Sequence, residues 1–189
     1  MIKASMLDKD SIVNVLFRSF EHDSFLKMML KSNNPGKIKI LFNYIVEEAF
    51  RIGEIYFNED KSGVVLLTSS EKEQMSVNLI IRFIKTAYRL GIRSVYQILR
   101  VNNTLHSFYP KSISYYHLAF IGVLPEKQGQ GIGSQLLSFV IAKAEKRNLP
   151  IYLETAKMSN VEIYTRRGFE VYDSVTLKTE IMFFMRKLC

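Results

Sequence analysis

The feature that most constrains this chain is a short glycine loop between an apolar run and an amphipathic run. The loop reads Gln128-Gly129-Gln130-Gly131-Ile132-Gly133; it follows the apolar residues 118–124 and Pro125, and it precedes the run 134–147. Three glycines in five positions let the backbone approach a ligand with no side chains between them. A helix that starts there presents unpaired N–H groups and positive dipole character. The pattern predicts a strand, a loop and a helix, and the loop is either an anion-binding cradle or a plain tight turn.

Two glycine-loop motifs that bind nucleotides are excluded by the spacing. No Lys-Ser/Thr pair follows Gly133, so the loop is not a P-loop. The dinucleotide fingerprint requires a third glycine where this chain has Ser134, and the loop lies past the middle of the chain.

The spacing Gln128-x-x-Gly131-x-Gly133 resembles the acetyl-CoA pyrophosphate loop of the GNAT superfamily of N-acetyltransferases. Neighbouring residues are similar too: Val123-Leu124-Pro125 to the end of the family's fourth strand, Leu153-Glu154-Thr155 to its fifth strand, and Asn160, Tyr164 and Gly168-Phe169 to its closing helix and turn. The strong resemblance covers residues 115–187, and the first half matches only in element order.

The resemblance implies acetyl-CoA as co-substrate, with the pyrophosphate on the loop and the pantetheine arm on the main chain of the fourth strand. The residues implied in this binding are Ile121, Gly122, Val123, Gln128, Gly129, Gln130, Gly131, Ile132, Gly133, Ser134 and Asn160. Gly122 in a buried strand fits either a bulge or close backbone approach, or a glycine packed under an aromatic ring.

Within the superfamily, the chain is most similar to small-molecule acetyltransferases of the puromycin acetyltransferase type. The similar segments are 118–137, 150–155, Asn160 to Phe169 and Met185-Arg186-Lys187. Many such relatives enter the fourth strand with a tryptophan, whereas this chain has Tyr115-Tyr116-His117 and no tryptophan. Puromycin is therefore not predicted; the expected acceptor is a primary amine of a small molecule.

Length and composition indicate the class of protein. The 189 residues predict one acetyltransferase domain over 1–189. The lone Cys189 excludes an internal disulfide framework and fits a reducing compartment. Lys3 and Asp8 interrupt any signal-like stretch, and no apolar run approaches the roughly 20 residues of a membrane helix. We expect a soluble cytoplasmic protein with no membrane partner.

The net charge of +8 is spread along the chain rather than gathered in one block. The densest stripe is Arg82, Lys85, Arg89 and Arg93, at helical spacing. A solvated helix face explains this stripe better than a nucleic-acid site, so no nucleic-acid partner is expected. The same positive balance would attract a polyanion such as CoA. Dimers are frequent in the superfamily, so the resemblance also admits a homodimer.

The hydrophobic patterns predict an α/β fold. Strands are expected at 2–6, 54–57, 63–68, 115–124, 150–155, 169–176 and 180–186. Helices are expected after Asp8 or Asp10 with an interruption at 21–25, and at 37–51, 76–90, 92–105, 134–147 and 160–167. The helix between the fourth and fifth strands predicts a parallel pair, and the last two strands predict an antiparallel pair. The resemblance adds a GNAT-like mixed, mostly antiparallel sheet with helices on both faces, splayed between the fourth and fifth strands.

Tyr164 is the predicted catalytic acid. It lies four residues after Asn160, so both residues share one helix face. A phenol is a neutral donor at pH 7, and the resemblance implies that it protonates the departing thiolate. The alternatives are a core aromatic with a satisfied hydroxyl for Tyr164 and a helix N-cap for Asn160.

Two residues are candidates for the base. His117 starts the fourth strand, on the face expected to hold Ala119, Ile121 and Val123. Glu154 ends the fifth strand and could act as base or as an anchor for a cationic substrate. A satisfied histidine and a structural carboxylate are the alternatives.

The candidate substrate-binding residues are His22, Asp23 and Tyr116, with loop capping as the alternative for the first two. His106 is expected on the surface or in a loop. Three histidines and one cysteine show no metal-ligand spacing, and no Gly-x-Ser-x-Gly elbow is present.

These residues predict an acetyl-CoA-dependent N-acetyltransferase that transfers the acetyl group directly, without an acyl-enzyme, because Cys189 lies outside the motif. Two rivals stay open. One is an N-acetyltransferase of the same fold that acts on a protein or peptide, and the other is a non-catalytic acyl-CoA-binding module.

Overall fold

The computed structural model describes residues 1–70 and 77–188, with side chains described outside 77–83. The described strands form one sheet in the order β1-β2-β3-β4-β5-β7-β6. Their bounds are β1 (Ile2–Lys3), β2 (Gly53–Phe57), β3 (Gly63–Ser69), β4 (Tyr116–Val123), β5 (Ile151–Thr155), β6 (Glu170–Leu177) and β7 (Glu180–Lys187). Neighbouring strands are antiparallel except β4 and β5, which are parallel. The predicted mixed, mostly antiparallel sheet is confirmed.

The helices are η1 (Met6–Asp8), α1 (Lys9–Phe20), α2 (Ser24–Leu30), α3 (Pro35–Ile52), α4 (Val77–Leu90), α5 (Ile92–His106), η3 (Pro125–Lys127), α6 (Ile132–Arg147) and α7 (Met158–Thr165). None of the helices in the described part of the chain is long and apolar enough to cross a membrane. Two sequence predictions, the start of a helix at Ser76 and the tail residue Cys189, fall outside the described residues.

Helix α2 is an element that the sequence reading missed. We predicted only an interruption near 21–25, but Asp23 caps a new helix by accepting a hydrogen bond from the backbone N–H of Leu26 at 3.0 Å. Leu26 and Leu30 then bury their side chains in the core. An N-cap carboxylate satisfies one of the unpaired N–H groups of a helix start, and burial of two leucines stabilises so short a helix.

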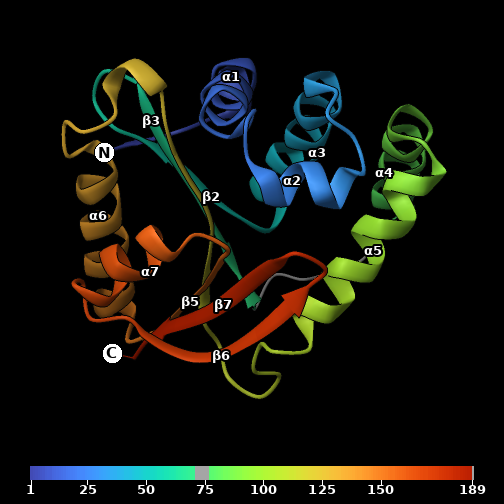
Figure 1. The fold of residues 1–189 in the computed structure, drawn as a ribbon. Coiled ribbons are helices and arrows are strands. Elements are labelled where there is room, and N and C mark those ends of the chain that lie inside the picture. Colours follow the sequence, from blue (N-terminus) through green and yellow to red (C-terminus); the bar gives the residue numbers. More distant parts are fainter. Residues whose placement is uncertain (71–76, 189) are drawn as a thin grey trace.

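The sheet separates two hydrophobic layers. Helices α1, α2 and α3 cover one face and α6 covers the other (Figure 1). Strand β3 shows the alternation: Val64 and Leu66 pack with the α1–α3 layer, while Val65 and Leu67 pack with the α6 layer. A third cluster joins Val101 and Leu105 of α5 to Tyr152 of β5 and Phe184 of β7.

Strands β4 and β5 separate soon after they meet. They pair only at Tyr116 with Ile151 and at His117 with Tyr152. Beyond these two positions β4 stays paired with β3, and β5 stays paired with β7. The predicted splay between the fourth and fifth strands is therefore present, and the edge of β4 from residue 118 onward has no strand partner on its β5 side among the described residues.

A β-bulge in β4 changes which residues share a face. Leu66 pairs with Phe120 and Leu67 pairs with Leu118, so Ala119 is the extra residue. Ala119 and Phe120 both pack with the α1–α3 layer, whereas Ile121 and Val123 pack with the α6 layer. Our prediction that His117 shares a face with Ile121 and Val123 is wrong, because an inserted residue shifts the two-residue alternation by one.

Gly122 lies where α1 approaches β4 closely. A Cβ at this position would lie 3.1 Å from Ser19 Oγ and 3.2 Å from Leu16 Cδ2. The close-approach interpretation of Gly122 is confirmed, with helix α1 rather than an aromatic ring as the neighbour. The bulge lies three residues earlier, at Ala119.

Candidate active site

The glycine loop leaves its outer surface open at two positions. Gly129 has φ 78° and Gly131 has φ 80°, the left-handed region that other residues rarely adopt. Apart from the two chain neighbours, no described residue has a heavy atom within 4 Å of a Cβ at either glycine. Gly131 is the N-cap of α6, so the loop leads directly to the first unpaired N–H groups of that helix.

The side chains of the loop hold the loop itself. Gln128 Nε2 donates to the carbonyl oxygen of Val123 at 3.0 Å, and Gln130 Nε2 donates to the carbonyl oxygen of Glu126 at 3.4 Å. Ile132 is buried in the α6 layer, so its backbone rather than its side chain is available at the helix start. Gly133 and Ser134 complete the first turn of α6. Main-chain N–H groups are therefore what this loop offers to an anion.

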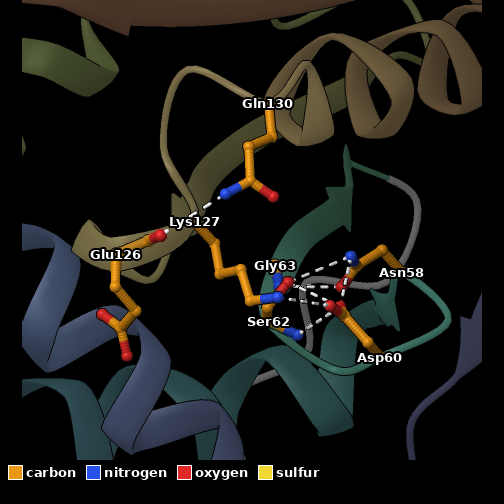
Figure 2. A network of polar contacts seen from close by, with 7 residues as sticks. All are labelled: Asn58, Asp60, Ser62, Gly63, Glu126, Lys127 and Gln130. Carbon is orange, nitrogen blue, oxygen red and sulfur yellow. Dashed lines mark hydrogen bonds and ion pairs between the residues drawn. The ribbon is translucent and has the colours of Figure 1, made fainter.

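The turn between β2 and β3 supports the loop from one side (Figure 2). Lys127 Nζ lies 3.6 Å from Asp60 Oδ2. Asp60 in turn accepts hydrogen bonds from Ser62 Oγ, Ser62 N and Asn58 Nδ2 at 2.5, 3.1 and 2.7 Å. The hydrogen bonds from Ser62 lower the pKa of Asp60 to about 2, so this carboxylate is ionised opposite Lys127 at neutral pH.

Helix α1 holds the same loop from another side. Arg18 Nη1 lies 2.7 Å from Glu126 Oε1. Ser19 Oγ lies 2.9 Å from the carbonyl oxygen of Val123, the atom that also accepts from Gln128. These contacts fix the end of β4 and η3, so the glycine loop starts from a braced position.

A second part of the candidate site brings together residues far apart in the chain. His117 Nε2 lies 2.8 Å from Glu154 Oε2, and the hydroxyl of Tyr109 donates to the same carboxylate oxygen. Thr68 Oγ1 lies 3.4 Å from His117 Nδ1. These four residues come from β4, β5, the segment after α5, and β3, and they meet where β4 and β5 begin to diverge.

A cavity of about 60 Å³ lies beside this cluster. Its walls include Tyr109, Tyr115, His117 and Glu154, together with Asn102, Leu105 and His106 from α5. Ile52, Thr68, Ser69 and Ser70 complete the lining. The lining is aromatic and polar, with one carboxylate.

Glu154 is ionised within this aromatic surrounding. Burial acts to raise the pKa of its carboxyl group, but the charge of His117 and the hydrogen bonds from His117 and Tyr109 outweigh burial and lower the pKa below its usual value of 4.5. Burial and the charge of Glu154 raise the pKa of Tyr109 well above 10, so this phenol stays protonated and donates.

Tyr164 stands on α7, its ring centroid 5.6 Å from that of Phe169. Burial raises the pKa of its phenol to about 12, and the charge of Glu154 adds to this rise. Its hydroxyl makes no hydrogen bond to any residue within 1–70 or 84–188. The residues in these ranges therefore leave the hydroxyl of Tyr164 available as a neutral donor.

Asn160 is the third residue of α7, and Lys157 is the N-cap of this helix. The N-cap alternative for Asn160 is wrong as well. Its Nδ2 donates to Thr155 Oγ1 at 3.2 Å, which ties α7 to the end of β5. This places Asn160 on the β5 side of the gap between β4 and β5.

Three predicted substrate residues do not line the cavity. Tyr116 is buried on the α6 side of the sheet, where its hydroxyl accepts from Arg147 Nη1 at 2.9 Å. Its neighbour Tyr115 lines the cavity instead, because successive strand residues point to opposite faces. The side chain of His22 is 88% exposed and lies 3.8 Å from Glu21 Oε1.

Asp23 caps α2, as the loop-capping alternative predicted, and its Oδ2 lies 3.2 Å from Lys157 Nζ. Because Lys157 directly precedes α7, this ion pair connects the turn between α1 and α2 to the start of α7.

Tyr109 and Thr68 are cavity residues that the sequence reading missed. Tyr109 is a single tyrosine in a loop before Pro110, and Thr68 is one threonine in an apolar strand. Neither belongs to a motif, so only a prediction of strand register could have found Thr68. In the described part of the chain, no group of His, Cys, Asp and Glu side chains is suited to hold a metal ion.

The comparisons with known proteins agree with this geometry. A family model described as an acetyltransferase (GNAT) domain matches residues 94–171. An uncharacterized N-acetyltransferase from Schizosaccharomyces pombe is 32% identical over 62 residues. That match spans 33% of this chain and only 25% of the yeast protein.

Solved structures resemble nearly the whole chain at low identity. A Corynebacterium glutamicum structure described as histone acetyltransferase HPA2 and related acetyltransferase has TM-score 0.71 and 21% identity, over 99% of this chain and 94% of that chain. Arylalkylamine N-acetyltransferase 2 from Aedes aegypti has TM-score 0.69 and 12% identity, over 98% and 96%. A polyamine N-acetyltransferase from Drosophila melanogaster has TM-score 0.59 and 11% identity, over 100% and 98%.

At these identities the structural likeness shows the fold alone. The splayed β4–β5 pair, the glycine loop that opens α6 and the matched neighbours agree on one architecture. The chain has the GNAT fold, and residues 94–171 match the model of a GNAT acetyltransferase domain.

Proposed function

We propose that this protein is an N-acetyltransferase that moves the acetyl group of acetyl-CoA directly to a primary amine of a small molecule. The observation that carries the proposal is the pair of His117 and Glu154, 2.8 Å apart at the point where β4 and β5 separate. A carboxylate and an imidazole there can bind a cationic amine and take its proton. The proposal treats residues 1–189 as one domain and gives the protein no membrane or nucleic-acid partner.

The residues present fit acetyl-CoA. The space above Gly129 and Gly131 is open, and the start of α6 supplies N–H groups and positive dipole character for a pyrophosphate. Ile121, Gly122 and Val123 lie on the part of β4 that has no strand partner toward β5 among the described residues, so their main chain is available to an amide-bearing arm. Asn160 stands across the same gap.

Deprotonation of the amine is the step that most needs the protein. A lysine-like amine has a reference pKa of about 10.4, so its deprotonation at pH 7 costs roughly 4–5 kcal/mol. A carboxylate whose pKa lies below 4.5 is a poor acceptor for that proton. We therefore assign Glu154 the binding of the ammonium and the orientation of His117. We assign the proton to Nδ1 of His117 in its neutral form, because Nε2 faces the carboxylate.

Acetyl-CoA, when bound, supplies an activated thioester carbonyl. In the transfer His117 first takes one proton from the bound ammonium, and the neutral nitrogen then forms a bond to the carbonyl carbon. The carbon–sulfur bond breaks with its electron pair on sulfur, and a second proton from the nitrogen goes to that sulfur, which leaves as the thiol. The free hydroxyl of Tyr164 is the donor for the leaving sulfur. Because its pKa is about 12, complete transfer to a thiolate of reference pKa about 8.5 is uphill by roughly 5 kcal/mol. Tyr164 therefore stabilises the developing charge chiefly by donating a hydrogen bond.

A small-molecule acceptor is supported by the small cavity beside Glu154. Solved structures of the same fold include an arylalkylamine N-acetyltransferase and a polyamine N-acetyltransferase. The resemblance to the puromycin acetyltransferase type enters the proposal only as this class of acceptor, and the acceptor itself is to be found by a screen.

The cofactor is tested by calorimetry with acetyl-CoA on the unmodified protein, Gly131→Glu and Gly131→Gln. Both substitutions impose the same backbone strain at φ 80°, and only glutamate adds a negative charge where the pyrophosphate would lie. We expect micromolar binding by the unmodified protein, weaker binding by the glutamine variant and none by the glutamate variant. If both variants lose the same acetyl-CoA affinity, backbone strain rather than charge explains the loss. If the unmodified protein does not bind acetyl-CoA, the proposed function is wrong.

The acceptor is tested with phenylethylamine, putrescine and a tripeptide with a free N-terminus. Turnover of either small amine supports the proposal. Faster turnover of the peptide would replace the small-molecule acceptor with a peptide. Tight binding of acetyl-CoA without any turnover would favour a binding module.

A further inference from the structure

Tyr109 is held in place by aromatic rings on several sides. Its ring stacks on that of Tyr115, with 5.9 Å between the centroids. It packs in T-shaped geometry against the rings of His117 and Phe184, at centroid distances of 5.0 and 6.0 Å. The side chain belongs to the third hydrophobic cluster and is only 8% exposed. A rigid ring of this kind loses little further freedom when its hydroxyl makes a hydrogen bond.

The hydroxyl of Tyr109 and the imidazole of His117 meet at a single atom. Both bind Oε2 of Glu154, whereas Oε1 of the same carboxylate takes no hydrogen bond from residues 1–70 or 84–188. A carboxylate can accept about four hydrogen bonds. Glu154 lines the cavity, so its uncommitted oxygen is the one left for a ligand.

We propose that Tyr109 is a positioning residue, which together with His117 fixes Oε2 of Glu154 and so presents Oε1 to the ammonium group of the acceptor. This inference rests on the proposed function for the identity of the ligand, although the arrangement of the three residues does not depend on it. The cavity of about 60 Å³ has room for on the order of four water molecules, which suits the ammonium end of a compact amine.

The charged and titratable groups that act on Glu154 come from several elements. They are His117 of β4, His106 of α5, Tyr109 after α5, Tyr164 of α7 and Tyr172 of β6. Among the three phenols, only Tyr109 donates a hydrogen bond to the carboxylate. Removal of this donor therefore raises the pKa of Glu154, because the ionised form loses a partner.

The test compares Tyr109→Phe with Tyr172→Phe. Tyr172 belongs to the same cluster, but its hydroxyl donates to the backbone oxygen of Phe108 at 3.1 Å rather than to Glu154. Both substitutions keep the ring and remove one hydrogen-bonded hydroxyl. The side-chain carboxyl carbon of Glu154, assigned by its absence in Glu154→Gln, is titrated by carbon NMR without acceptor. We expect the midpoint of this titration to move to higher pH in Tyr109→Phe and to stay in place in Tyr172→Phe.

Kinetics with the better of phenylethylamine and putrescine gives a second readout. Tyr109→Phe should raise KM for the amine about tenfold, as expected for a lost hydrogen bond to a charged group. Acetyl-CoA affinity should be unchanged. In the Glu154→Gln background, Tyr109→Phe should have little further effect on KM.

The inference is wrong if the midpoint of the Glu154 titration stays in place in Tyr109→Phe. It is also wrong if this midpoint moves by the same amount in Tyr109→Phe and Tyr172→Phe. Either result leaves the proposed function intact, since that is decided by acetyl-CoA binding and turnover of the unmodified protein. Conversely, the carboxyl titration can be carried out even if no amine is acetylated.

Discussion

Two tyrosines near Glu154 differ in whether their hydroxyl has a hydrogen-bond partner. Tyr109 commits its hydroxyl to the carboxylate, whereas Tyr164 has no hydrogen-bond partner among the described residues. Burial raises the pKa of both phenols. At the scale of single residues, a neutral phenol with a free hydroxyl suits a departing thiolate, and a neutral phenol bound to a carboxylate suits the placement of that carboxylate.

Tyr164→Phe should lower kcat about a hundredfold and leave acetyl-CoA affinity nearly unchanged, because the donor acts on charge that develops only in the transition state. The phenol has a pKa of about 12 and stays protonated up to that pH, so the loss should be the same factor at every pH from about 7 to about 10. Steady-state rates across this range measure it. A variant with unchanged kcat would remove Tyr164 from the acid role.

At the scale of elements, the glycines of the loop before α6 differ in backbone conformation. Gly129 and Gly131 have positive φ, whereas Gly133 lies in the first turn of the helix. The η3 turn before them is tied to α1 through Arg18 and to the β2–β3 turn through Asp60. Local sequence makes the turn, and contacts from distant elements hold it at the end of β4.

Gly131→Ala and Gly133→Ala form a matched pair that compares a glycine of positive φ with a glycine in the first turn of a helix. Gly131→Ala forces a side chain into the left-handed region and should lower the free energy of unfolding by about 1 kcal/mol. Gly133→Ala adds a Cβ at an ordinary 3.9 Å from Val123 Cγ2 and should leave stability equal or raise it by up to about 1 kcal/mol. Urea unfolding of both variants measures the difference. Equal destabilisation would contradict the assigned backbone roles.

At the scale of the whole molecule, the site exists because three layers meet at β4. The α1–α3 layer packs on one face and α6 on the other (Figure 1), while the third cluster brings α5 and Tyr109 against β5 and β7. The cavity beside Glu154 lies where β4 and β5 begin to separate, and the glycine loop follows the far end of β4. The spacing between α1 and β4 sets the room beside Gly122, close to the end of β4 that leads to the glycine loop.

Gly122→Val tests that spacing. Its Cβ would crowd Ser19 Oγ and Leu16 Cδ2, so we expect a loss of about 1–3 kcal/mol in the free energy of unfolding. Ser19→Gly removes two of the three nearest atoms, and in that background the cost of Gly122→Val should be smaller. Urea midpoints of the four proteins give the coupling. Additive effects would show that α1 does not limit the space at residue 122.

Sequence alone determined the features that depend on neighbours along the chain. The glycine loop, the amphipathic helix after it, the parallel β4–β5 connection and the closing β6–β7 pair follow from short-range spacing and hydrophobic period. The resemblance of residues 115–187 added the splayed sheet and the role of Tyr164 as expectations. The pairing of His117 with Glu154 could be anticipated only in part, since both were named as separate candidates for the base.

Only the tertiary structure decided which side chains meet. One extra residue at Ala119 moved Ile121 and Val123 to the face opposite His117, and no local pattern marks such a bulge. Because successive strand residues point to opposite faces, Tyr116 contacts Arg147 and Tyr115 lines the cavity. Tyr109 reaches Glu154 across 45 positions of the sequence. Hydrophobic period is a property of adjacent residues, whereas contacts of this kind depend on how separate layers pack, so they could not be predicted from the sequence of either partner.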